Sequence, residues 1–259
     1  MAQGLPRTRF NRSGLVRVLA ELAVTDVPES KQSSAERLGQ WLNFTDALAL
    51  FSALNADKAG AFELGSVARS PESAAARTAF ARVRAAVVES ITTDGALKSG
   101  KARVELPTPA PQASAEGAAD FAPYHRYYLA HQRDMSASIG PLRGSVRAAL
   151  NGHSRALKRL AALDGVLDQA LAARERELLA TVPVLLARRF EHLYKAHQAK
   201  QAEAQTEDDP QRWMQPGAWL AVFCGEMRAV LLAELDLRLQ PIAGLIAALD
   251  HEPGAGSGR

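Results

Sequence analysis

The sequence predicts an all-α protein, and three observations carry that prediction. Apolar residues recur at alternating spacings of three and four, which places them on one side of a helix that must be buried. Two such stripes are Met135, Ile139, Leu142, Val146 and Ala149, and Leu235, Leu239, Ile242, Ile246 and Leu249. Ala, Leu and Arg, which favour helices, are abundant, while alternating strand patterns are scarce. The 259 residues, 47% of them hydrophobic, suffice for a substantial core.

The first 93 residues are predicted to form a small N-terminal helical lobe. Ser13 is a candidate cap for a first helix with an apolar side of Leu15, Val16, Leu19 and Leu22, which ends before Pro28. A second helix is expected over residues 34 to 54. Its expected inward side consists of Leu38, Trp41, Leu42, Leu48 and Phe51.

The third helix has the clearest start. Ser70 is a candidate cap, Pro71 stands at the first turn, where no amide hydrogen is needed, and Glu72 lies near the positive end of the helix dipole. The pattern continues to about Ile91. Residues 94 to 120 then change to Gly, Pro, Ser, Ala and Thr, a composition typical of a flexible or extended linker.

Residues 121 to 250 predict a C-terminal bundle or hairpin of long helices. Gly140-Pro141 is expected to kink or break the first of them, because proline removes a backbone hydrogen bond. A helix from Ser154 to about Lys200 should kink at Pro183. The last helix is expected over residues 217 to 250, and the Gly-rich residues 251 to 259 are predicted to be a disordered tail.

The composition and the sequence patterns indicate the cellular compartment. A single cysteine, Cys224, excludes an intrachain disulfide and favours a reducing compartment. The N-terminus has no secretory signal pattern, and the longest uncharged stretches fall short of the ~20 residues that a membrane-spanning helix needs. We therefore expect a soluble, cytoplasmic protein with no transmembrane segment.

No motif for catalysis, a cofactor or a metal withstands scrutiny. Residues 95 to 101 match the phosphate-binding loop up to its lysine, but Ala102 replaces the required Ser or Thr, and the context is wrong. The histidine spacings do not form helical metal pairs, and Cys224 lies in an apolar run typical of an inert core residue. We expect no catalytic residue, no cofactor and no metal, and hence not an enzyme.

Residues 121 to 159 carry seven basic residues against one acid, Asp134, whereas residues 160 to 210 carry six against nine. The basic stretch is a candidate polyanion-binding surface. An acidic neighbour in a helical hairpin or a dimer would neutralise it equally well. Its members are Arg126, Arg133, Arg143, Arg147, Arg155, Lys158 and Arg159.

Several segments resemble an uncharacterised proteobacterial family, known as domain of unknown function three-three-four-eight, over nearly the whole chain. They are residues 7 to 24, 40 to 42 and 45 to 47, 139 to 143, 160 to 176, and 233 to 241. The resemblance implies a bacterial source and carries over no functional residue. It also implies an accessory role for the chain in an envelope-associated complex.

The function that these observations favour is that of a non-enzymatic interaction protein. It would bind a protein partner or a second copy of itself through helix–helix or coiled-coil contacts. The apolar stripes would contribute affinity and the charged flanks would select the partner. The alternative is a nucleic-acid-associated protein that uses the basic surface of residues 121 to 159.

Overall fold

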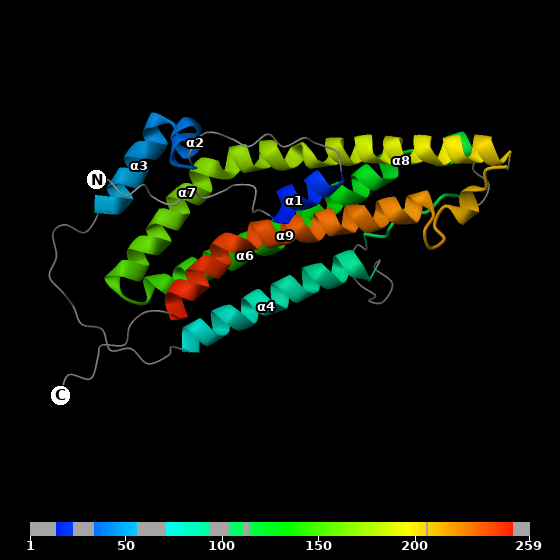
Figure 1. Ribbon diagram of the computed structural model, residues 1–259. Helices are drawn as coiled ribbons and strands as arrows, with labels where there is room; N and C mark the ends of the chain where they lie inside the picture. The colour runs from blue at the N-terminus through cyan, green and yellow to red at the C-terminus, as the bar shows by residue number, and fades with distance from the viewer. Residues whose placement is uncertain are drawn as a thin grey trace, which may run out of the picture.

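In a computed structural model, the described residues are 14–22, 34–55, 71–93, 104–110, 114–205 and 207–250, and all their regular structure is helical. The all-α prediction is thus confirmed (Figure 1). The helices are α1 (Gly14–Glu21), α2 (Ser34–Trp41), α3 (Phe44–Asn55), α4 (Pro71–Thr92), α5 (Ala115–Ala118), α6 (Ala122–Asn151), α7 (Arg155–Ala180), α8 (Val182–Ala204), the 3-10 helix η2 (Pro210–Arg212) and α9 (Trp219–Asp250).

The long helices form a bundle. If α7 and α8 are taken as one bent helix, each long helix runs opposite to the long helix before it in the sequence (Figure 1). The start of α4 meets the end of α9, where Ser73 Oγ lies 2.7 Å from Asp250 Oδ1. Further along α4, an ion pair joins Arg84 to Asp236 of α9 at 3.2 Å. α6 runs parallel to α9, since Tyr128 and Ser136 of α6 bond to Glu234 and Arg238, in the same order. The bundle therefore consists of α4, α6, α7 with α8, and α9.

Both apolar stripes predicted from the sequence are buried. Met135 and Val146 of α6 are almost inaccessible, and so are Leu235 and Ile242 of α9. Burying one such side chain contributes roughly 1.5 to 3 kcal/mol, so these stripes account for much of the bundle's stability. The core of α6 and α9 is therefore built from the apolar stripes that the residue spacing predicted.

Proline has different effects in two of these helices. A kink or a break was expected at Gly140-Pro141; α6 continues from Ala122 to Asn151 with Pro141 inside it, so the helix does not break there. Pro141 is exposed, whereas Ile139 and Leu142 beside it are buried. The packing of this face stabilises the helix against the loss of one hydrogen bond, which outweighs the local cost of proline.

The bend expected at Pro183 is present. α7 ends at Ala180 and α8 begins at Val182, so together they form one bent helix. Pro183 has no N–H to donate to the carbonyl four residues earlier, that of Leu179. Gln132 of α6 supplies a replacement, because its Nε2 donates to the Leu179 oxygen at 3.3 Å. A side chain of α6 thus supplies the hydrogen-bond donor that the Leu179 carbonyl loses because of Pro183.

The N-terminal helices contact the bundle directly. α1 and α4 pack against α9, α4 also packs against α6, and α3 packs against α7. In the segment predicted as a linker, Val104 and Leu106 are half-buried against the core. The division into an N-terminal lobe, a linker and a bundle stays a prediction. Ser13, Ser70, the loop-like residues 95–101 and the tail after residue 250 lie outside the described residues.

The helix expected over residues 34 to 54 is two helices. The first ends at Trp41 and the second begins at Phe44. Asn43 Oδ1 accepts from the Asp46 N–H at 2.8 Å, and Asp46 Oδ2 accepts from the Asn43 N–H at 3.1 Å. This reciprocal pair is a capping box, which starts a new helix.

In the part of the chain that the structure describes, no helix is long and apolar enough to cross a membrane.

Candidate interaction surface

Helix α3 exposes an apolar stripe to solvent. Phe44 is 84% exposed, Leu48 55% and Phe51 63%, and Leu54 at their flank is 44% exposed. The spacing of four and then three residues places Phe44, Leu48 and Phe51 on one side of the helix. We call these three residues the α3 stripe. The sequence predicted Leu48 and Phe51 to face inward, and that prediction is wrong.

The opposite side of α3 faces the bundle. Ala49 and Ala53 are half-buried there, and α3 packs against α7. At the end of α2, the Arg174 guanidinium of α7 lies 5.5 Å from the centre of the Trp41 ring, a cation–π contact. α3 therefore presents the α3 stripe to water, while Ala49, Leu50 and Ala53 are half-buried on the packed side. Clustered large apolar side chains on a surface typically mark an interaction site.

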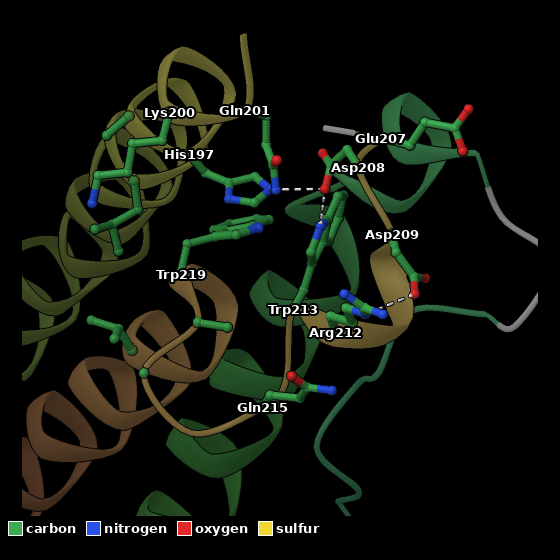
Figure 2. A pocket seen from close by; sticks show the side chains of 15 residues that line it. His197, Lys200, Gln201, Glu207, Asp208, Asp209, Arg212, Trp213, Gln215 and Trp219 are labelled. Carbon is green, nitrogen blue, oxygen red and sulfur yellow. Dashed lines mark hydrogen bonds and ion pairs between the residues drawn. The ribbon is translucent and has the colours of Figure 1, made fainter. Parts of the chain in front are cut away.

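A second feature is a cavity of about 500 Å³ at the turn between α8 and α9, which we call the turn pocket (Figure 2). At its centre, Asp208 Oδ1 lies 2.8 Å from His197 Nε2 and accepts from Trp213 Nε1 at 2.7 Å. Trp213 and Trp219 pack edge to face with ring centres 5.0 Å apart. Both indoles are buried.

The contacts of the turn pocket hold α8 against the segment that leads into α9. A His–Asp pair supports catalysis when it activates a nucleophile or a water beside a bound substrate. Among the described residues that line the pocket, no Ser, Thr, Cys or Tyr offers a hydroxyl or thiol for His197 to activate. Asp208 instead connects α8 to the segment that leads into α9, and the indoles fill the end of the bundle.

The most deeply buried charge is Glu234 of α9, which is inaccessible to solvent. Its carboxylate accepts from Tyr128 Oη at 2.6 Å and from Gln132 Nε2 at 3.0 Å, both on α6. Arg238, one turn later on α9, donates from Nη2 at 2.7 Å. A buried carboxylate is tolerated when its oxygens are bonded and its charge is paired. Glu234 meets both conditions, so it fixes the alignment of α6 with α9.

Tyr128 is suited to its role as a donor. Burial raises the pKa of its phenol far above the ordinary value, and the negative charge of Glu234 raises it further, against a smaller opposite effect of Arg238. The hydroxyl therefore stays protonated and donates at every physiological pH.

The basic stretch of residues 121 to 159 is partly neutralised within the fold. Arg143 donates to Asp164 at 2.6 and 2.9 Å and to Asp168 at 2.7 Å. Arg147 bonds to the same two carboxylates, at 3.3 and 2.9 Å. These four residues connect α6 with α7. The acidic segment that follows the basic one thus compensates two of its charges across the helical hairpin.

The remaining basic residues do not form one patch. Arg126 and Arg133 are exposed on the first half of α6, whereas Arg155, Lys158 and Arg159 are exposed at the start of α7. At 1.5 Å per residue, the 18 residues from Arg133 to the end of α6 at Asn151 span roughly 27 Å. The structure therefore separates the predicted polyanion surface into two groups, and Arg155 also has an interaction partner in the fold.

The other candidates singled out in the sequence are dispersed. Cys224 is buried in α9. His131 is buried in α6 beside Tyr127, and His125 and His192 are exposed. Among the described residues, no three His, Cys, Asp or Glu side chains are grouped so as to hold a metal ion.

Comparison with known proteins gives one finding. The model of a family described as "Protein of unknown function (DUF3348)" matches residues 1–251. The chain belongs to this family. No curated protein and no solved structure matches the chain. Membership in the DUF3348 family agrees with the resemblance seen in the sequence, and it assigns no activity, ligand or partner to any residue.

Proposed function

We propose that this protein is a helical interaction protein that binds an apolar helix of a protein partner through the α3 stripe. The observation that supports the proposal is the exposure of Phe44, Leu48 and Phe51 on one side of a helix whose other side is packed. Recognition of this kind uses anchors spaced at i, i+4 and i+7, and the stripe has this spacing.

Covering the α3 stripe with a partner is favourable in free energy, because it removes apolar surface from water. Removing a large apolar side chain from water contributes roughly 1.5 to 3 kcal/mol, and aromatic side chains are enriched among residues that dominate binding energy. Two of the three stripe residues are phenylalanines. A fold that buries its other apolar stripes in α6 and α9 leaves this one available for a partner.

The proposal concerns binding and not catalysis. The buried Glu234 cluster and the Arg143–Asp164 network have structural explanations in the contacts described above. The basic residues of 121 to 159 offer a second surface of lower charge density than the sequence suggested, because Arg143 and Arg147 are paired. The α3 stripe is therefore the surface on which the functional proposal rests.

The test is site-specific photo-crosslinking in living cells of the native host. A benzophenone amino acid replaces Phe51 in the full chain, and in a control chain it replaces Val222, an exposed apolar residue of α9. Figure 1 places α3 at the end of the bundle away from the start of α9. We expect a crosslinked adduct of defined mass at position 51 and none at position 222. Mass spectrometry should identify a crosslinked peptide whose sequence has apolar residues at i, i+4 and i+7. Equal adducts at both positions, or none at position 51, would overturn the proposal.

A further inference from the structure

We propose that the α3 stripe binds the α3 stripe of a second copy of this chain, with the two helices antiparallel about a twofold axis. This inference rests on the proposed function, because it names the partner of the same surface. Three observations support it: the symmetry of the stripe, the position of charge on α3 and the area that is exposed.

The stripe is nearly palindromic. Phe44 lies four residues before Leu48, and Phe51 lies three residues after it. In an antiparallel pair centred near Leu48, each Phe44 faces the Phe51 of the other copy, and the two Leu48 side chains meet at the axis. A twofold interface requires this kind of self-complementary surface, in which residue i meets residue j and residue j meets residue i.

Charge permits the pairing. The ionisable residue of α3 is Asp46, which lies on the side opposite the stripe, is half-buried and is bonded to Asn43. The residues beside the stripe include the uncharged Thr45 and Ser52. Pairing of the two α3 helices therefore brings no like charges of α3 together, a juxtaposition that would cost several kcal/mol. α3 itself carries no cluster of charge that would select a strongly basic or acidic partner.

The exposed area fits a reversible dimer. Taking roughly 200 Å² for a fully exposed large apolar side chain, the exposed fractions of Phe44, Leu48, Phe51 and Leu54 amount to roughly 500 Å² per copy. Two copies would bury roughly 1,000 Å², at the lower limit for a specific interface. Interfaces of this size are typical of weak, transient association, so we expect monomer and dimer to exchange as the protein concentration changes.

The experiment is a charge-swap test by sedimentation velocity from 1 to 200 μM protein. The full chain is compared with Leu48→Glu, Leu48→Lys and an equimolar mixture of the two variants. Because Leu48 of one copy meets Leu48 of the other, each variant alone should be monomeric through like-charge repulsion. The mixture should recover the dimer. Val222→Glu, at the other end of the bundle, should dimerise like the unmodified chain.

Helix orientation is tested with cysteines, since Cys224 is buried. A mixture of Phe44→Cys and Phe51→Cys chains should form a mixed disulfide faster than either variant forms a disulfide with itself. Faster self-linking would contradict the antiparallel arrangement. Circular dichroism of every variant checks that the exposed substitutions leave the helices intact.

The outcomes separate this inference from the proposed function. A chain that stays monomeric at 200 μM, or a mixture that fails to dimerise, overturns self-pairing. If position 51 then crosslinks to a different protein in cells, the proposed function stands and only the identity of the partner is wrong. If position 51 gives no adduct, both are wrong. If the sole product is a crosslink within the same chain, the stripe contacts no second molecule and both are likewise wrong.

Discussion

Glu234 shows at the scale of one residue how a charge is accommodated in this core. Its carboxylate is bonded by Tyr128, Gln132 and Arg238, so its removal leaves three polar groups without their acceptor. Breaking a buried ion pair from one side typically costs about 3 to 5 kcal/mol. We expect Glu234→Ala to lower the free energy of unfolding by about that amount in urea denaturation.

The matched control is Glu203→Ala, which removes an exposed carboxylate of α8. It should change the free energy of unfolding by less than about 0.5 kcal/mol. Tyr128→Phe removes one hydrogen bond to the same carboxylate and should have an intermediate effect, about 1 to 3 kcal/mol. Equal stability of Glu234→Ala and Glu203→Ala would contradict the described role of the cluster.

His131 predicts a pH dependence of stability. Burial lowers the pKa of its imidazole, and the charge of Asp134 opposes this only in part. The unfolded chain, whose histidine titrates near 6.5, therefore binds a proton at a higher pH than the folded chain. Stability contributed by neutral His131 is present above that value and is lost as the pH falls toward the lowered pKa.

Urea denaturation at pH 7, 6 and 5 measures this loss. The unmodified chain should lose stability with falling pH at up to about 1.4 kcal/mol per pH unit more steeply than His131→Phe. His192→Phe alters an exposed imidazole and should retain the slope of the unmodified chain. Parallel slopes for the unmodified chain and His131→Phe would show that His131 does not control this dependence.

Arg143 illustrates why a charge cannot be assigned to a surface from the sequence alone. It was a candidate for polyanion binding, yet it bonds to Asp164 and Asp168. We expect Arg143→Gln to lower thermal stability by several degrees, because it leaves the buried Asp164 with Arg147 as its remaining charged partner. Arg126→Gln and Arg133→Gln, at exposed positions, should leave the melting temperature unchanged.

The same variants test the nucleic-acid alternative. Binding through phosphate contacts weakens steeply with salt, and each lost contact lowers the slope of log K against log salt by about 1. If the alternative is correct, Arg126→Gln with Arg133→Gln should lower the slope for duplex DNA by about 2. No binding at low salt, or an unchanged slope, would exclude this surface.

At the scale of elements, the break between α2 and α3 changes what the N-terminal part can do. A continuous helix over residues 34 to 54 would have tied the orientation of Leu48 and Phe51 to that of Leu38. The Asn43–Asp46 capping box starts a second helix instead, and its packed side is the one with Ala49 and Ala53. The sequence contained this signal in Asn43 and in Asp46 three positions later.

Asn43→Ala should therefore weaken α3 selectively. Loss of a cap costs about 1 kcal/mol of helix stability, so amide hydrogen exchange over residues 46 to 52 should accelerate about fivefold. Amides of α9 should exchange at the rate of the unmodified chain. Ser52→Ala, an exposed substitution inside α3, is the control and should leave both rates unchanged. Equal protection of α3 with and without Asn43 would show that packing on α7 alone fixes its start.

Elements with strong internal patterns could be predicted from the sequence, and those set by distant contacts could not. The stripes of α6 and α9 and the bend at Pro183 follow from spacing and from proline chemistry. The continuity of α6 through Pro141 depends on the packing of its buried side, which local propensity does not contain. No sequence motif marks Gln132, because its hydrogen bond to the Leu179 carbonyl depends on how α6 packs against another helix.

At the scale of the whole molecule, the same limit applies to the candidate site. The sequence pattern placed Leu48 and Phe51 on one side of a helix, but burial or exposure of that side depends on which helix packs against the other one. Here α7 packs on the side of α3 that carries Ala49, Leu50 and Ala53, and the α3 stripe stays exposed. The same holds for two ion pairs, Arg143 with Asp164 and His197 with Asp208. Each joins two segments of the chain, and no local sequence pattern predicts that these segments meet.

Crosslinking from the two sides of α3 shows whether the α3 stripe is a binding surface. With the benzophenone amino acid at position 51, we expect an intermolecular adduct in cells. At position 53, on the side that packs against α7, we expect no intermolecular adduct. Adducts from position 53 but not from position 51 would show that the α3 stripe is not the binding surface.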